Sequence, residues 1–226
     1  MQKVWVISLG GSRIVPNEVD YNFLKEFKEM IERHKSKKFV VVTGGGSTAR
    51  RYIKSLQKLG QKTKNQSLIG IYVTKLNASL MTKIIGKEAN ETIPDNMHEV
   101  KNLLRKNQIV FCGALRYKEK NTSDGTAANL AAYLKTSFIN LTNVRGIFDK
   151  NPKTNKNAKF IKYISWKNFY ETANKMKFKA GQHYVLDQNA SKIIMEHKIP
   201  TYITGSLNDI ENIISGKKFK GSLIFG

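Results

Sequence analysis

Two glycine-rich segments contain residue types that bind phosphate. The first is SLGGS, residues 8–12, and the second is TGGGS, residues 43–47, which is followed closely by Arg50 and Arg51. Glycine lets backbone amides approach an anion, and a helix that starts at such a loop adds the positive end of its dipole. The forked guanidinium of arginine can hold non-bridging phosphate oxygens. The sequence therefore predicts two adjacent phosphate sites, an arrangement suited to phosphate transfer.

Neither loop matches the common nucleotide-binding patterns. Neither fits GxxxxGK[ST], and neither is a GxGxxG followed about twenty positions later by an acidic residue, so a P-loop and a dinucleotide fold are disfavoured. A third segment, NTSDGTAANLAAYL, places hydroxyl groups and Asp124 at a predicted helix start. We interpret Asp124 or Ser123 as the helix cap. A second role remains open, in which Asp124 orients a cation or a basic side chain.

These segments belong to an alternation of strands and helices with short connections. Apolar runs predict strands at residues 4–9, 39–43, 108–111, 137–142 and 201–204, and an edge strand at 222–225. Helical spacing of apolar residues predicts helices at residues 21–34, 46–59, 68–85, 124–134, 187–197 and 206–215, the last capped by Ser206. Residues 145–162 are predicted to form an extended loop or hairpin. The pattern favours an α/β fold with a mainly parallel sheet covered on both faces.

The composition favours a soluble intracellular protein with a strongly basic surface. The chain has 226 residues, one cysteine and a formal net charge of +22. The apolar start is too short for a signal peptide, and we expect no membrane span and a cytoplasmic location. The lysines are spread along the whole chain, which favours a dispersed solvated surface, although a dedicated nucleic-acid patch is the alternative.

The sequence shows little side-chain chemistry beyond phosphate binding. The four histidines form no evident cluster, and Cys112 is interpreted as a buried thiol at a strand end. No metal-ligand spacing of His, Cys or carboxylate residues is present, so we predict no metal site formed by the protein alone. Magnesium is expected to arrive with ATP, held by phosphate oxygens and water.

The ordered motifs resemble the amino acid kinase superfamily, and most closely the archaeal-type uridylate (UMP) kinases. The resemblance rests on SLGGS, GGGSTARRY, TSDGTAA, LTNVRGIFDKNP and KAGQHYVLDQNASKI, and it extends over essentially the whole chain. It implies a three-layer α/β sandwich, a homohexamer and transfer of the ATP γ-phosphate to UMP in pyrimidine nucleotide synthesis. It also implies one domain over residues 1–226, with an acceptor-binding part at about 1–135 and an ATP-binding part at about 136–226.

The same resemblance assigns roles to individual residues. Those implied to bind ATP are Ser8, Leu9, Gly10, Gly11, Ser12, Gly46, Arg50, Thr142, Phe148 and Asn151. Those implied to bind UMP are Gly45, Ser67, Ala114, Thr122 and Ser123. The residues expected to act directly in transfer are Gly11, Ser12, Arg50 and Asp124.

Several positions depart from the family pattern and keep other functions open. Ser67 stands where the family usually has an aspartate that binds the nucleoside sugar, and Arg145, Phe148 and Asn151 replace an acid, a tyrosine and an aspartate of the donor motif. The turn CGALRYKEKNTSD is longer than usual. One alternative is a related kinase with another acceptor. Another is a non-catalytic protein of the same fold that binds nucleotides or RNA.

Overall fold

The computed structural model describes residues 3–117, 122–150, 152, 154–175 and 185–226. In this part of the chain the strands are β1 (Val4–Leu9), β2 (Lys38–Thr43), β3 (Ile109–Cys112), β4 (Phe138–Leu141), β5 (Ile147–Phe148), β6 (Phe160–Ile161), β7 (Tyr163–Ile164), β8 (Thr201–Thr204) and β9 (Ser222–Ile224). The helices are α1 (Gly11–Ile14), α2 (Tyr21–Arg33), α3 (Gly46–Lys58), α4 (Thr63–Ile85), α5 (Met97–Lys106), α6 (Ser123–Tyr133), α7 (Trp166–Lys175), α8 (Gln188–Glu196) and α9 (Leu207–Ile214).

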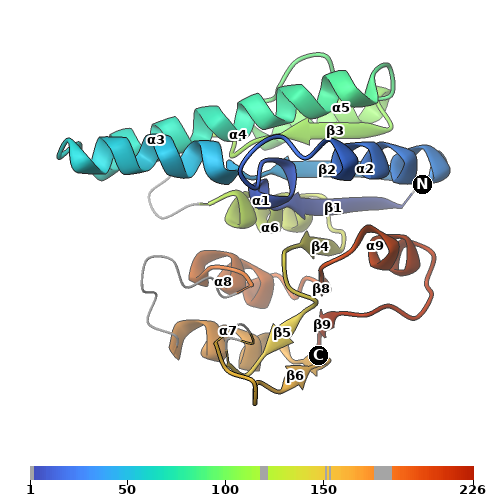
Figure 1. Cartoon of the computed structure of the whole chain (residues 1–226). Coiled ribbons are helices and arrows are strands. Elements are labelled where there is room, and N and C mark those ends of the chain that lie inside the picture. Colours follow the sequence, from blue (N-terminus) through green and yellow to red (C-terminus); the bar gives the residue numbers. More distant parts are fainter. Residues whose placement is uncertain (1–2, 118–121, 151, 153, 176–184) are drawn as a thin grey trace.

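One sheet runs through the middle of the molecule, with its strands in the order β3-β2-β1-β4-β8-β9-β7 (Figure 1). The first five strands are parallel, whereas β9 runs antiparallel to β8 and parallel to β7. Strands β1, β2 and β3 are almost continuous apolar runs because helices cover both faces of the sheet. The parallel strands therefore end at one edge, where their following loops meet.

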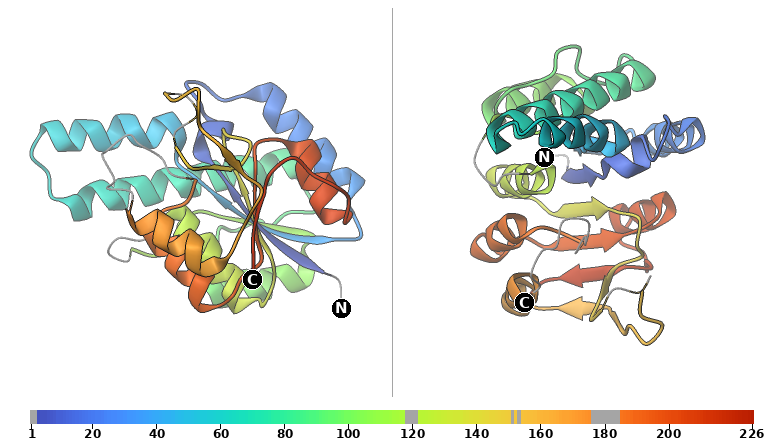
Figure 2. Two further views of the ribbon diagram at one scale, coloured as in Figure 1. Left: turned by 90° about the horizontal axis from the view of Figure 1, so that it is seen from below. Right: turned by 60° about the vertical axis from the view of Figure 1, so that its left-hand side comes forward.

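Alternate residues of the strands point into two separate cores. One core contains residues of α2, α4 and α9, and the other contains residues of α5, α6, α7 and α8. Along β1, for example, Ile7 belongs to the first core and Val6 to the second, as the side-chain alternation of a strand requires. Figure 2 shows these layers of helices on either side of the strands. The predicted three-layer α/β sandwich is confirmed.

Most predicted elements are present, and one strand was misplaced. The run 222–225 was predicted as an edge strand, but β9 lies between β8 and β7, and Ser222 is fully buried. The true edge is β7, whose two residues are too few to give a periodic pattern. Helices α5 and α7 were not predicted. The predicted hairpin is present as the antiparallel pair β5 and β6.

Helix α4 is the longest of the described helices and is largely apolar. Among the described helices it is long and apolar enough to cross a membrane by length and composition alone. In the structure it instead packs against α3, β2 and β3, and it contributes Ala78, Met81 and Ile85 to the first core. Core helices of globular proteins have the same composition, so the packing accounts for this one.

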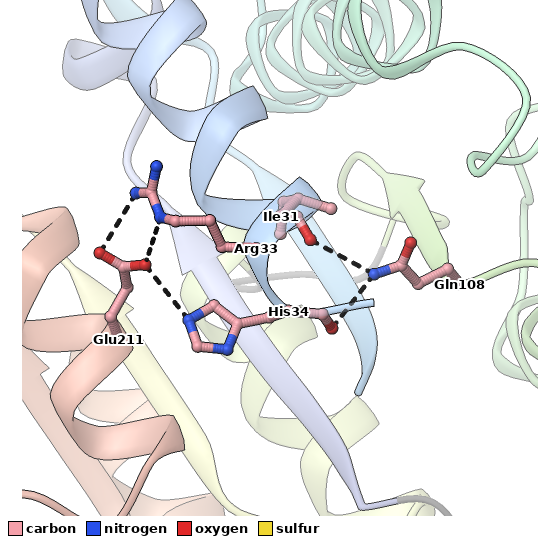
Figure 3. A network of polar contacts seen from close by, with 5 residues as sticks. All are labelled: Ile31, Arg33, His34, Gln108 and Glu211. Atoms are coloured by element: carbon pink, nitrogen blue, oxygen red, sulfur yellow. Dashed lines mark hydrogen bonds and ion pairs between the residues drawn. The ribbon is translucent and has the colours of Figure 1, made fainter. Parts of the chain in front are cut away.

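A polar network joins α2, early in the chain, to α9, near its end (Figure 3). Arg33 donates through Nε and Nη2 to the two carboxylate oxygens of Glu211, at 2.9 and 3.2 Å. The ring nitrogen Nε2 of His34 lies 3.2 Å from Glu211 Oε1, and Gln108 donates to the carbonyls of Ile31 and His34. The hydrogen bond from Arg33 is the main reason that the pKa of Glu211 is lowered. The network ties helices from the two halves of the chain together.

Candidate functional site

The two glycine loops touch each other at the carboxyl ends of β1 and β2. A Cβ atom on Gly11 would lie 2.0 Å from the backbone nitrogen of Gly46, and one on Gly44 would lie 2.4 Å from the nitrogen of Gly11. No side chain fits at either position, so the backbones approach as closely as glycine allows. The prediction that the two loops are neighbours agrees with this geometry.

Helix α3 begins at the second loop, directly beside the first loop. Gly45 occupies the cap position, and Gly46 has a φ of +64°, with its missing Cβ only 2.5 Å from the carbonyl oxygen of Gly11. The first-turn amides of a helix have no partner within that helix, and they carry its positive dipole end. Two nearby amides are already used, since Ser47 N donates to the carbonyl of Val15 at 2.9 Å and Gly10 N to that of Leu141 at 3.3 Å. The amides of Gly11, Ser12 and Gly46 are the candidates for binding phosphate oxygens.

The two arginines lie on the exposed side of this surface. Arg50 Nη2 contacts the carbonyl of Pro16 at 3.4 Å, and Arg51 Nη2 contacts the carbonyl of Asn17 at 3.3 Å. Ser47 also donates to Asn17, at 3.1 Å. The structure therefore places Arg50 near the loop after α1, where its exposed guanidinium holds a single long hydrogen bond.

The end of β1 is joined to the start of α6 by a partly buried hydrogen bond. The hydroxyl of Ser8 donates to Asp124 Oδ1 at 2.6 Å. Burial raises the pKa of the Asp124 carboxyl to about 6; the bond from Ser8 acts in the opposite direction, and the nearby Asp187 adds to the rise. No described lysine or arginine forms an ion pair with Asp124. The interpretation of Asp124 or Ser123 as the cap is wrong, because Thr122 caps α6 by accepting from Gly125 N at 3.0 Å.

Asp187 is a further candidate for the site, and the sequence analysis did not select it. It caps α8 by accepting from Ala190 N at 2.9 Å, and its other oxygen accepts a hydrogen bond from Thr122. Asn140 on β4 fixes the preceding segment by donating to the carbonyl of Val185 at 2.6 Å. The starts of α6 and α8 therefore meet, and two carboxylates lie near the end of β1. In the sequence, the signal that could have indicated Asp187 is its place as an acidic residue at the start of the predicted helix 187–197.

Helix α4 supports the other side of the site, near β2 and β3. Asn77 Nδ2 donates to the carbonyl of Gly44 at 2.7 Å, and Thr74 Oγ1 accepts from Ala114 N at 2.9 Å. Ser67 lies one turn before Gly70, whose carbonyl is 3.8 Å from the missing Cβ of Gly45. Neither Thr74 nor Asn77 was singled out in the sequence. Both fix loops that hold predicted UMP contacts.

The predicted donor contacts extend from β1 across β4 to the hairpin. Leu9 is buried, and Gly10 N donates to the carbonyl of Leu141 at 3.3 Å, which joins the first loop to β4. Thr142 N donates to the carbonyl of Thr204 at 2.9 Å. Phe148 packs edge-on against Phe160, with 5.5 Å between ring centroids. Asn151 lies outside the described residues.

The remaining reactive side chains lie outside this arrangement. Cys112 is fully buried, and burial raises the pKa of its thiol to about 12. His34 belongs to the α2–α9 network, and His183 lies outside the described residues. In the described part of the chain no three His, Cys, Asp or Glu side chains gather as a metal site. The chemistry of the site therefore rests on amides, hydroxyls, Arg50 and two carboxylates.

Comparison with known proteins gives one consistent family. A profile described as "Amino acid kinase family" matches residues 3–205. Uridylate kinase of Archaeoglobus fulgidus is 37% identical over 216 residues, covering 94% of each chain, and that of Thermoplasma volcanium is 33% identical over 219 residues, covering 96% of this chain and 95% of its own. The crystal structure of the Archaeoglobus fulgidus enzyme covers 99% of this chain and 100% of its own, with a TM-score of 0.86 and 34% identity. UMP kinase from Ureaplasma parvum, at 20% identity and a TM-score of 0.79, shares the fold over the full length of both chains.

Proposed function

The chain belongs to the amino acid kinase family, and we propose that it transfers the γ-phosphate of ATP to UMP, giving ADP and UDP. The observation that carries the proposal is the direct backbone contact between Gly11 and Gly44–Gly46. It brings two phosphate-binding loops together without any side chain between them. Two phosphates held there lie close enough for transfer from one to the other.

Phosphoryl transfer mainly requires that two anions are held in line and that negative charge is neutralised. A UMP phosphate oxygen is already a nucleophile, so the site needs no general base. In this proposal Gly10 lets the donor phosphates approach closely, Gly11 and Ser12 hold them through their backbone amides, and Gly45 holds the acceptor phosphate. Arg50 leaves its long contact with Pro16 and binds phosphate oxygens with its guanidinium.

The carboxylates of Asp124 and Asp187 are proposed to lie on the donor side. Hard oxygen ligands and a retained water shell suit Mg²⁺, and these two groups are the acids that border the end of β1. They would hold the Mg²⁺ that accompanies ATP, and this ion supplies neutralisation of phosphate charge. Asp124 also fixes the hydroxyl of Ser8, so it orients the end of the first loop.

We propose that the two parts of the chain bind different substrates. Residues up to about 135 hold the acceptor through Gly45, Ser67, Ala114, Thr122 and Ser123. Residues from about 136 hold the donor nucleoside through Thr142, Phe148 and Asn151, while the first loop and Arg50 reach across to its phosphates. The hydrogen bond from Gly10 to Leu141 and the pairing of β1 with β4 keep the two parts in register.

We also propose a homohexamer located in the cytoplasm and acting in pyrimidine nucleotide synthesis. The hairpin of α3 and α4 projects beyond the sheet (Figure 1). Tyr72 and Leu76, one turn apart on α4, are each 62% exposed. Large apolar side chains repeated along one helix face are typical of surfaces that contact another chain.

The activity is tested by incubating the protein with Mg²⁺-ATP and each nucleoside monophosphate in turn. We expect ADP and UDP in equal amounts with UMP alone. Stoichiometric product with a different monophosphate would identify that nucleotide as the acceptor instead of UMP. Ser67, which replaces the usual sugar-binding aspartate, would be a reason for such a change. Nucleotide binding without any diphosphate product would reject kinase activity on nucleotides.

A further inference from the structure

A basic groove lies beside the β5–β6 hairpin, next to the N-terminus of α9. It is a cavity of about 710 Å³ between the loops that follow β4 and β8, strand β6 and the segment that leads from α9 to β9. None of the residues that line it belongs to the glycine loops or to the predicted donor and acceptor contacts. Cavities of this size accommodate small molecules up to a nucleotide.

Four exposed cations line the basic groove, namely Arg145, Lys162, Lys218 and Lys220. Within the described chain none of them forms an ion pair with a carboxylate. The one acid in the lining, Asp209, is buried and accepts hydrogen bonds from the Ser206 hydroxyl at 2.6 Å and from Lys220 N at 2.7 Å. These bonds satisfy its oxygens, and four cations against one carboxylate leave the groove with a net positive charge.

Arg145 is held in place by two aromatic rings. Its guanidinium lies 4.7 Å from the ring centroid of Phe160 and 5.3 Å from that of Phe148. Stacking fixes the plane of the guanidinium and leaves its N–H edges free to donate. An arginine fixed in this way loses little side-chain entropy when it binds an anion.

The orientation of the neighbouring helix distinguishes this groove from the other basic cavity. Lys3, Lys135 and Lys198 line a cavity of about 800 Å³ at the opposite end of the sheet. There α6 and α8 end, and their negative dipole ends account for the lysines. At the basic groove α9 begins instead, with Asp209 in its first turn, so no helix C-terminus accounts for the four cations.

We propose that the basic groove binds the triphosphate chain of a free nucleotide, at a site separate from the transfer centre. Four cations match the charge of a triphosphate, and the volume leaves room for a nucleoside. Phe148 links this site to the predicted donor site, because Arg145 stacks on its ring from the side of the groove. The inference depends on the groove alone and is independent of the proposed kinase activity.

The test is a calorimetric titration of the full-length Gly11→Ala variant with inorganic triphosphate, because its transfer centre is expected not to bind phosphate and its groove is unchanged. A second titration uses CTP, so that a nucleotide can be told from the phosphate chain alone. Lys218→Gln together with Lys220→Gln is expected to weaken both ligands at least tenfold, because two charge-assisted contacts are lost. The control is Lys87→Gln with Lys106→Gln, which removes two exposed lysines from a different cavity.

Selective weakening by the first pair of substitutions supports the site, and tighter binding of CTP than of triphosphate identifies a nucleotide. Equal weakening by both pairs would show that overall charge, rather than the groove, attracts the anion. Unchanged binding in the Lys218 and Lys220 variant, or no binding to the Gly11→Ala protein, would overturn the proposal. Thermal unfolding of both variants checks that they remain folded.

Discussion

The Asp124 carboxyl gives a pH-dependent prediction for stability. Its pKa is raised to about 6 by burial, so the folded state favours the protonated form more than the unfolded state does. This stabilisation is fully present below the unfolded pKa and is lost as pH rises through about 6. Asp124→Asn should therefore be more stable than the native protein at pH 8, by ~1–3 kcal/mol. Urea unfolding without nucleotides, at pH values from 4 to 8, measures the difference.

The control for this prediction is Asp149→Asn. Asp149 is exposed and accepts from Lys159 N at 2.7 Å, a bond that asparagine also accepts. Asp149→Asn therefore measures the effect of removing an exposed carboxylate, for comparison with the carboxylate of Asp124. A stability gain of Asp124→Asn that does not change with pH would contradict the assigned cause. Phosphate transfer by the same variant should fall even though the protein is more stable.

Gly11→Ala should remove phosphate binding. The added methyl group would lie 2.0 Å from Gly46 N, so the two loops must separate, at a cost of about 1–3 kcal/mol in stability. Gly60→Ala is the matched control, because Gly60 has a φ of +67° and no atom within 4 Å of its missing Cβ. Strain alone makes that substitution cost ~1–2 kcal/mol. Titration with UMP and with an ATP analogue should detect loss of affinity in the first variant and none in the second.

Arg50→Ala should lower kcat/KM about a hundredfold or more, because the charge that we propose neutralises the transferred phosphate is lost. Arg51→Ala is the control, since the two arginines are both exposed and make similar long hydrogen bonds with carbonyls of the loop after α1. Steady-state kinetics with UMP should show a much smaller effect at Arg51. Equal losses at the two positions would mean that both act by holding that loop.

The glycine loops, Asp124 and the arginines could be selected from the sequence because each belongs to a short local motif. Thr74, Asn77 and Asp187 could not, because their roles depend on partners that are 40, 33 and 65 residues away. The cap of α6 was assigned wrongly for a related reason. Thr122, Ser123 and Asp124 are all suitable cap residues, and the partly buried bond from Ser8 engages Asp124 and leaves Thr122 to cap the helix.

At the scale of elements, apolar runs and helical spacing predicted the strands and helices that fill the two cores. Helices α5 and α7 escaped prediction because each buries only two residues of its own, Val100 and Leu104 in α5 and Phe169 and Ala173 in α7. The place of β9 depends on β7, which is two residues long. Strand order in this region is set by long-range pairing, which a local pattern does not contain.

The network between α2 and α9 gives a prediction at the same scale. Glu211→Gln should lower the free energy of unfolding at pH 7 by about 0.5–1 kcal/mol, since Arg33 is more than half exposed and solvent weakens the pair. Because the pKa of Glu211 is lowered in the folded state, its contribution to stability is fully present above the unfolded pKa. It is lost as the pH falls through the lower folded-state pKa. Urea unfolding at several pH values measures this effect. Glu32→Gln, in an exposed pair with Lys28, is the control and should change stability less.

At the scale of the whole molecule, the net charge can be read from the sequence, but the place where basic residues gather into a groove cannot. The net charge of +22 comes from lysines spread over the chain, as expected for a dispersed surface. The basic groove collects four cations from residues 145, 162, 218 and 220, which are neighbours only after β4, β6 and the chain before β9 have come together. A scan of the sequence for charge clusters therefore finds only part of this site, at residues 217–220.

Assembly gives the last prediction. If copies of the chain associate through α4, Tyr72 and Leu76 become buried, and each would contribute about 1–2 kcal/mol per copy, since each is 62% exposed beforehand. Tyr72→Glu with Leu76→Glu should then dissociate the proposed hexamer into smaller species, as seen by sedimentation velocity. Tyr163→Glu is the control, because Tyr163 is 57% exposed but lies on β7, at the edge of the sheet far along the strand order from β2 and β3, which contact α4. Dissociation by Tyr163→Glu alone would place the interface at the β7 edge, and no change in either variant would remove both surfaces from the assembly.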